Sequence, residues 1–235
     1  MRPTRRAIGL LTVPGYPLLP AILASLRSCE DIEPVLLFDA KGFSQKDRRI
    51  FHERTGGAFE AQAPSFDAYR QETFMSHDDP ACRASVRAQR IALLVNAGTP
   101  RKLTLETIQS APLGVLNVHP GLLPAYRGAT CCEWAIWNDD PVGVTAHLMN
   151  EEFDGGPILF SRTLAVAKGQ RYTDIRVALY RLSIAAYAEA IRGLLDATLQ
   201  PIPQEQPGPV RAPMPEELLA QVKAKLEAGV YACAI

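Results

Sequence analysis

Three polar side chains near the middle of the chain are suited to acyl transfer. Asn117 and His119 are two residues apart at the end of a predicted strand, so their side chains leave it on the same side. Asp154 follows a later predicted strand. An amide and an imidazolium can stabilise the oxyanion of a tetrahedral intermediate, while a carboxylate can orient the imidazole and help to remove a proton from an attacking amine. We therefore predict that these three residues are catalytic.

The segments around these residues are rigid or open to close approach. Pro120 ends the strand, and the following loop contains Gly121 and further proline and glycine residues. Such a loop can hold a side chain that titrates near neutral pH in a fixed position. Gly155 and Gly156 follow Asp154 and allow a ligand to approach the backbone closely.

The elements that must position these side chains alternate between strands and helices. Apolar runs predict buried strands, and helical patterns lie between several of them. This alternation is typical of an open, mostly parallel α/β sheet, in which ligands bind beyond the carboxyl ends of the strands. The predicted strands of the first half cover residues 7–13, 33–38, 90–98 and 114–118.

The rest of the chain is less uniform. Residues 64–88 are charged and poorly periodic, and we expect a helix or two there. Residues 142–149 and 157–166 predict neighbouring strands, and residues 172–195 predict a long amphipathic helix. The proline-rich residues 201–215 predict an extended strap before a last helix.

Composition excludes several classes of protein. Lys plus Arg and Asp plus Glu both number 25 among 235 residues, so the net charge of zero argues against nucleic acid and membrane surfaces as partners. The five cysteines match no metal-binding spacing, and the adjacent Cys131 and Cys132 have no basic neighbour that would favour a thiol nucleophile. We therefore predict a cytoplasmic protein without a metal.

Two segments resemble one known family closely. Residues 117–128 read NVHPGLLPAYRG, and residues 143–159 read GVTAHLMNEEFDGGPIL. They resemble the folate-dependent formyltransferases, whose signature is an Asn-x-His-Pro segment, then Gly-x-Thr-x-His, then Asp-(Gly/Thr)-Gly. The resemblance covers residues 90–166 closely. It implies a Rossmann-like α/β formyltransferase domain, 10-formyltetrahydrofolate as the cosubstrate, and catalysis by Asn117, His119 and Asp154.

The same resemblance implies where the folate binds. The family's folate loop resembles residues 97–103, so the predicted contacts there are Gly98, Arg101, Lys102 and Leu103. A second group of contacts falls on Glu152, Phe153 and Gly155, with the pterin held largely by backbone groups.

Five residues are predicted to contact the acceptor substrate: Tyr16, Pro120, Gly121, Arg127 and His147. Three of these have structural alternatives. Tyr16 could instead pack within its loop, and Arg127 could pair with a nearby acid rather than with a substrate phosphate or carboxylate. His147 could be a hydrogen-bonded residue of the core.

Departures from the family pattern reduce the range of expected acceptor substrates. Residues 12–17 lack the Gly-x-Gly-Ser-Asn phosphate loop of glycinamide ribonucleotide transformylase, and the C-terminal segment is shorter than the further domain of methionyl-tRNA formyltransferase. We expect an N-formyltransferase acting on a nucleotide-linked amino sugar or the amine of a specialised metabolite. Glycinamide ribonucleotide formyltransferase, 10-formyltetrahydrofolate hydrolase and an inactive folate-binding module are the alternatives.

We expect two parts in the chain, a catalytic domain over residues 1–200 and an extension over residues 201–235. The sequence does not identify the acceptor or the roles of the extension and of Cys131 and Cys132. It also does not decide whether the protein forms a homodimer.

Overall fold

The computed structural model describes residues 5–60 and 65–235. The chain divides into two compact units, each described by itself. The first unit comprises Met1–Ile50, Phe59–Asn117 and Tyr187–Gln200, and the second comprises Phe51–Ala58, Val118–Ala186 and Pro201–Ile235. The main sheet has the strand order β3-β2-β1-β4-β5-β7-β8, so the predicted Rossmann-like, mostly parallel α/β fold is confirmed.

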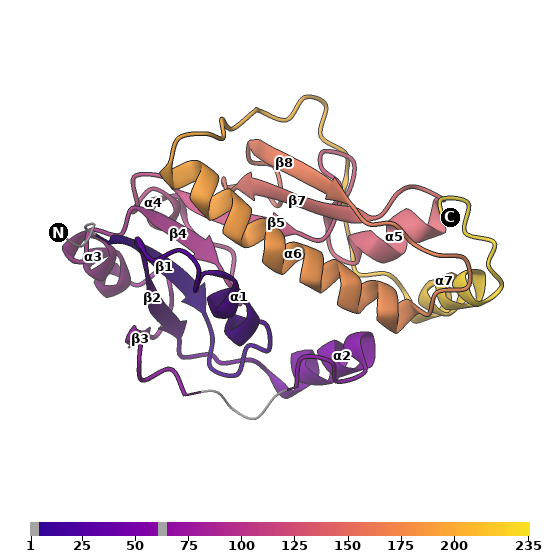
Figure 1. Cartoon of the computed structure of the whole chain (residues 1–235), viewed down its shortest axis with the longest axis horizontal. Helices are drawn as coiled ribbons and strands as arrows, with labels where there is room; N and C mark the ends of the chain where they lie inside the picture. The colour runs from indigo at the N-terminus through magenta and orange to yellow at the C-terminus, as the bar shows by residue number, and fades with distance from the viewer. Residues whose placement is uncertain (1–4, 61–64) are drawn as a thin grey trace. The chain divides into compact units, whose positions relative to one another are not determined.

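The first unit is built on parallel strands (Figure 1). On β1, Leu10 and Leu11 are consecutive and both fully buried, so this strand is covered on both faces. The strands of this unit are β1 (Arg6–Thr12), β2 (Ile32–Asp39), β3 (Arg70–Phe74), β4 (Leu93–Asn96) and the first residues of β5 (Val115–His119). Its helices are α1 (Leu19–Ser25), α3 (Pro80–Ala88) and α4 (Leu105–Ile108), with the first residues of α2 (Gln45–Thr55).

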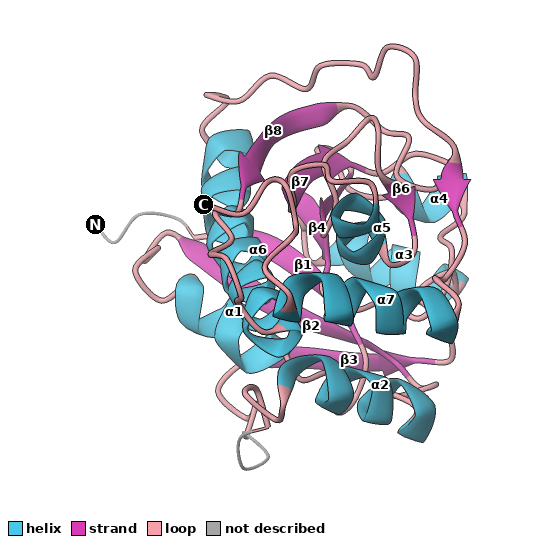
Figure 2. Ribbon diagram, turned by 90° about the vertical axis from the view of Figure 1, so that its right-hand side faces the viewer, coloured by secondary structure: helices cyan, strands magenta, loops and turns pink. Residues whose placement is uncertain are grey.

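The second unit holds the antiparallel pair β7 (Gly143–Leu148) and β8 (Ile158–Thr163). The helices are α5 (Cys131–Trp137), most of α6 (Tyr172–Leu195) and α7 (Glu216–Glu227). Within this unit, α5 and α7 lie side by side (Figure 2).

The proline-rich strap is an ordered part of the second unit. Its Val210–Arg211 segment, β9, pairs in parallel with Arg127–Gly128, β6. Near its start, Ile202 forms an isolated bridge with Ile158 of β8. The strap therefore continues a short sheet next to the segment that follows His119.

The sequence prediction for residues 64–88 was partly wrong. Residues 80–88 form the helix α3, but residues 70–74 form the strand β3; Pro64 lies outside the described residues. Four of the five β3 residues are exposed, because β3 lies at the edge of the sheet, next to β2. An edge strand facing water carries polar residues and lacks the apolar run by which a buried strand is recognised.

Within residues 5–60 and 65–235, no helix is long and apolar enough to cross a membrane. In the same ranges, no group of three or more His, Cys, Asp or Glu side chains is arranged to hold a metal ion.

Candidate active site

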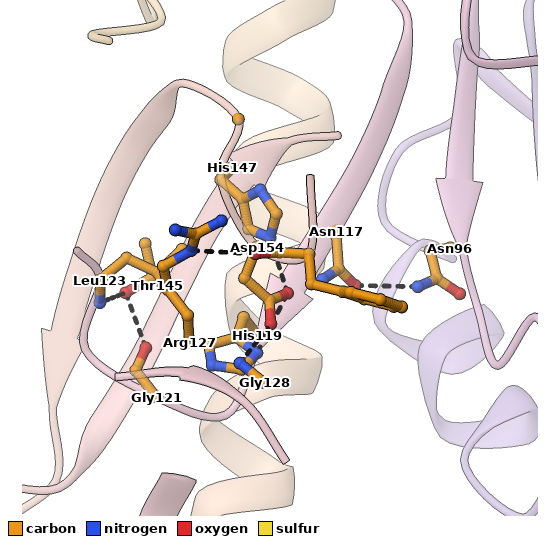
Figure 3. A network of polar contacts seen from close by, with 12 residues as sticks. Asn96, Asn117, His119, Gly121, Leu123, Arg127, Gly128, Thr145, His147 and Asp154 are labelled. Carbon is orange, nitrogen blue, oxygen red and sulfur yellow. Dashed lines mark hydrogen bonds and ion pairs between the residues drawn. The ribbon is translucent and has the colours of Figure 1, made fainter. Parts of the chain in front are cut away.

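His119 and Asp154 form a largely buried pair in the second unit (Figure 3). The Nδ1 of His119 lies 3.3 Å from Oδ1 of Asp154, and the His119 side chain is 4% exposed. Its Nε2 lies 2.8 Å from the carbonyl oxygen of Tyr126. The carbonyl oxygen and the ionised carboxylate can both only accept, so the neutral ring, with one N–H, donates to one of them, whereas the imidazolium donates to both.

Burial sets the resting charge of this pair. Burial lowers the pKa of His119, and the nearby His147 lowers it further, although the charge of Asp154 acts in the opposite direction. Burial raises the pKa of Asp154, but the neighbouring His147 and His119 and the hydrogen bond from the Gly128 N–H outweigh it, so the pKa stays below its ordinary value. At neutral pH the pair therefore consists of a neutral imidazole and a carboxylate.

The structure places His147 beside the same carboxylate. Its Nε2 lies 3.6 Å from Oδ1 of Asp154, and its Nδ1 donates to the carbonyl oxygen of Leu148 at 3.0 Å. His147 is almost fully buried and hydrogen-bonded, as the structural alternative predicted. It also lies beside the predicted site, and its contact with substrate stays a prediction.

The backbone around Asp154 is held from two sides. Asp154 has φ 50°, in the left-handed region that Asp adopts more readily than most residues. The Gly128 N–H donates to its Oδ2 at 2.8 Å. From the strap, Gln204 Nε2 donates to the carbonyl oxygens of Asp154 at 2.8 Å and Gly156 at 2.7 Å.

Thr145 fixes the loop that follows His119. Its hydroxyl donates to the carbonyl oxygen of Gly121 at 2.8 Å and accepts from the Leu123 N–H at 3.0 Å. A Cβ on Gly121 would lie 2.6 Å from the Nε2 of His119, so only glycine leaves room for the imidazole. Pro120 precedes this close approach as the first residue after β5.

Arg127 is buried against the Asp154 loop. Its guanidinium donates to the carbonyl oxygen of Phe153 at 2.9 Å and to the Glu152 carboxylate at 3.0 Å. These contacts favour the structural alternative for Arg127, and its contact with substrate stays a prediction. A Cβ on Gly155 would meet Glu152 and Arg127, so the loop is tightly folded around the contact between these two side chains. The Phe153 side chain is 57% exposed.

In the first unit, the side-chain amide of Asn117 is hydrogen-bonded to that of Asn96. The Nδ2 of Asn96, at the end of β4, donates to the Oδ1 of Asn117 at 3.0 Å (Figure 3). Asn117 lies two residues before His119 on β5, so strand alternation turns both side chains to one face.

The predicted folate loop of the first unit is held by side chains. Arg101 forms a two-bonded ion pair with Asp39, whose side chain is fully buried, with distances of 2.7 and 3.1 Å. Leu103 is buried, and Lys102 is exposed. The ring of Tyr16 packs so closely on Gly98, which has φ +94°, that a Cβ there would lie 2.7 Å from it. Tyr16 thus packs within the loops, and its contact with substrate stays a prediction.

Sequence reasoning missed Asn96 and Gln204. The ladder between β4 and β5 pairs Leu94 with Val115 and Val95 with Leu116, and one further step sets Asn96 beside Asn117. Each of these strands carries an asparagine near its carboxyl end, but this signal points to a contact only once β4 and β5 are known to be neighbours. Gln204 gave no such signal, because its partners lie about fifty positions earlier in the chain.

Comparison with known proteins identifies the family. Residues 43–191, more than half of the chain, match the family model described as formyl transferase. The chain therefore belongs to the formyl transferase family, as its motifs indicated.

One curated relative is a methionyl-tRNA formyltransferase from Synechococcus sp. (strain JA-2-3B'a(2-13)). It is 35% identical over 137 residues, which are 58% of this chain and 42% of that protein. The matched part is thus less than half the length of this relative.

Three solved structures share the fold. A sugar N-formyltransferase from Shewanella sp FDAARGOS_354 has a TM-score of 0.64 at 18% identity, over 88% of this chain and 76% of that one. Glycinamide ribonucleotide transformylase 1 from Symbiobacterium toebii has a TM-score of 0.63 at 21% identity, over 85% and 95%. PseJ from Anoxybacillus kamchatkensis, in complex with UDP-4,6-dideoxy-4-formamido-L-AltNAc and tetrahydrofolate, has a TM-score of 0.56 at 17% identity, over 97% of both.

Proposed function

We propose that this chain transfers a formyl group from 10-formyltetrahydrofolate to an amine, with Asn117, His119 and Asp154 as its catalytic residues. The observation that carries the proposal is the buried contact between His119 and Asp154, at 3.3 Å, at the end of the strand that also bears Asn117. Membership of the formyl transferase family and the tetrahydrofolate bound to PseJ support it.

The side chains and backbone near the predicted folate segments suit such a cosubstrate. When bound, 10-formyltetrahydrofolate supplies an electrophilic formyl carbon on a nitrogen that can leave. The loop after β4 is irregular backbone anchored by Asn96 and Arg101, which suits recognition of a heterocycle by main-chain groups. Phe153 offers an exposed apolar ring in the second unit. Gly98, Arg101, Lys102 and Leu103 remain the first group of predicted contacts, and Glu152, Phe153 and Gly155 the second.

The lowered pKa of His119 changes the expected order of proton transfers. The sequence suggested an imidazolium from the start, whereas burial makes the neutral ring the resting form. We propose that the pair of His119 and Asp154 takes the proton that the attacking amine loses, and that the imidazolium formed is stabilised by the carboxylate. The Nδ2 of Asn117 donates to the oxyanion as charge develops, and the pair of His119 and Asp154 then returns the proton to the leaving nitrogen.

For the acceptor, a nucleotide-linked amino sugar is our first candidate. PseJ was solved with a UDP-linked formamido sugar, and residues 12–17 lack the phosphate loop of the purine enzyme. The amine of methionyl-tRNA is the second candidate, because the curated relatives carry that name.

The proposal is tested by incubating the purified protein with 10-formyltetrahydrofolate and a panel of amines. The panel contains nucleotide-linked amino sugars, free amino acids, glycinamide ribonucleotide and methionyl-tRNA, and both tetrahydrofolate and formylated product are measured. Amine-dependent release supports a transferase. Release without any amine indicates a hydrolase, and folate binding without turnover indicates an inactive binding module.

His119→Ala tests the assignment of the catalytic group. We expect turnover to fall by at least about a hundredfold, because general acid–base catalysis is lost. Circular dichroism should match that of the parent protein, and His52→Ala on α2, outside the site, is a control for removing a histidine. Parent-like turnover in His119→Ala would exclude this mechanism.

A further inference from the structure

Asn96, at the carboxyl end of β4, makes three side-chain hydrogen bonds within the first unit. Its Oδ1 accepts from the N–H groups of Gly98 at 3.2 Å and Thr99 at 3.0 Å. Its Nδ2 donates to the Oδ1 of Asn117 at 3.0 Å. On the main chain, the Asn96 carbonyl oxygen accepts from the hydroxyl of Tyr187 at 2.7 Å, so both backbone and side chain are held.

The chemistry of these partners determines which way both amides face. A backbone N–H can only donate, so the atom of Asn96 that faces Gly98 and Thr99 has to be the oxygen. The nitrogen of Asn96 then faces Asn117 and requires an acceptor there, which is the oxygen of Asn117. The Nδ2 of Asn117 is consequently turned away from Asn96.

We propose that Asn96 is a positioning residue that selects the orientation of the Asn117 amide, so that Nδ2 and not Oδ1 faces the reacting formyl group. This inference rests on the proposed function. The reverse orientation would place a carbonyl oxygen against the developing oxyanion, replacing an attraction by a repulsion. Because the same Asn96 side chain holds the N–H groups of Gly98 and Thr99, the predicted folate loop and the oxyanion donor share one anchor.

Asn96→Asp separates these two roles. One carboxylate oxygen can still accept from Gly98 and Thr99, but the group facing Asn117 becomes an acceptor. The Asn117 amide is then expected to rotate so that its Nδ2 donates to that carboxylate. We expect kcat to fall about a hundredfold to a thousandfold, as when an oxyanion donor is removed, with little change in KM for 10-formyltetrahydrofolate.

Two comparisons distinguish orientation from general damage. Gln109→Glu makes the same amide-to-carboxylate change on an exposed side chain of the first unit and should leave kcat unchanged. In an Asn117→Ala background, Asn96→Asp should cause no further loss of kcat, because no amide is left to orient. An equal loss in both backgrounds would overturn the proposal and make Asn96 a purely structural residue.

Asn96→Ala is a second variant in case Asn96→Asp does not fold. It removes the anchor without imposing the reverse orientation, so KM for 10-formyltetrahydrofolate should rise and kcat should fall less than in Asn96→Asp. Its kcat loss should disappear in the Asn117→Ala background, while its rise in KM should persist. Persistence of the kcat loss would contradict the inference.

The orientation can also be measured without turnover. The side-chain amide resonances of Asn117 in a ¹⁵N-labelled protein are assigned by their loss in Asn117→Ala, and they should shift strongly in Asn96→Asp but not in Gln109→Glu. Unchanged resonances would refute the inference even where the protein is active. If the parent protein releases no tetrahydrofolate with any amine, the proposed function fails, and these resonances still decide whether Asn96 orients Asn117.

Discussion

The environment of one residue, His119, determines which proton the candidate site can move. Its Nε2 faces a backbone carbonyl oxygen, and its Nδ1 faces the Asp154 carboxylate, so both ring nitrogens are already oriented toward acceptors. Burial favours the neutral ring, and the carboxylate favours the charged ring. A histidine held between these two effects can accept a proton while charge develops and release it afterwards.

The pH dependence of kcat/KM tests this interpretation. In the proposed mechanism the neutral form of His119 is the active one, and burial lowers its pKa from the ordinary value of 6.5. We therefore expect kcat/KM to be level near neutral pH and to fall on the acid side, with an apparent pKa below 6.5. In Asp154→Asn, which removes the charge that raises the pKa, any residual acid limb should move to still lower pH.

Protein stability has to be followed over the same pH range. His77 is fully buried, and burial lowers its pKa as well. The unfolded chain then binds more protons than the folded chain below the ordinary pKa of histidine, so stability declines as the pH falls below about 6.5. Thermal unfolding at each pH identifies where this loss begins. A rate that rises as the pH falls, in protein that stays folded, would contradict a neutral His119.

At the scale of elements, the pattern of apolar residues predicts the strands and helices that depend on neighbouring residues in the sequence. Strands β1, β2, β4 and β5 are recognisable because they are apolar, and α6 begins and ends where its amphipathic pattern does. The strand β3 is not recognisable from the sequence, because its residues are mostly polar, as suits a strand exposed to water at the edge of the sheet. The pairing of β9 with β6 is equally hard to predict, because each of these strands has only two residues and so carries no periodic signal.

The strap gives the next prediction. Gln204 donates to the carbonyl oxygens on both sides of Gly155, and Gln206, two residues further, is exposed. Gln204→Ala should leave two carbonyl groups without this donor and destabilise the protein by about 1–3 kcal/mol. Since Asp154 sits in that loop, we also expect kcat to fall by about tenfold, as happens when a supporting contact of a site is lost.

Gln206→Ala is the matched control, with the same chemical change in the same strap. It should keep the stability and kcat of the parent protein. Equal effects of the two substitutions would show that the strap as a whole, and not the Gln204 contacts, determines the geometry of the Asp154 loop. Denaturant unfolding and steady-state kinetics on the two variants decide this.

For the whole molecule, the candidate site was predictable where it depends on neighbouring residues. Asn117, His119 and Asp154 stand in two short motifs, and strand alternation relates the first two directly. The supports of these residues, Asn96 and Gln204, depend instead on which strands become neighbours and on where a distant segment returns. Such contacts are products of the tertiary fold, so composition and periodicity do not reveal them.

The C-terminal residues bear on how the whole chain is organised. Residues 201–235 belong to the second unit, and α7 lies beside α5 there. From α7, Lys225 Nζ donates to the carbonyl oxygens of Ile136 and Trp137 at 3.1 and 3.2 Å. Leu226, on the same helix, is 2% exposed. The division of the chain at residue 200 is still a prediction, and these contacts show how to test it.

Leu226→Ala should lower the free energy of unfolding of the second unit by about 2–5 kcal/mol, the usual effect of truncating a buried leucine. Both tryptophans of the chain, Trp134 and Trp137, lie on α5, so their fluorescence reports the unfolding of this unit. If residues 201–235 fold cooperatively with the unit, the fluorescence midpoint in denaturant moves with the loss of stability. If residues 1–200 instead form an independent domain, α7 frays and the midpoint stays in place. Gln221→Ala, on an exposed position of the same helix, controls for a change in helix propensity and should leave the midpoint unchanged.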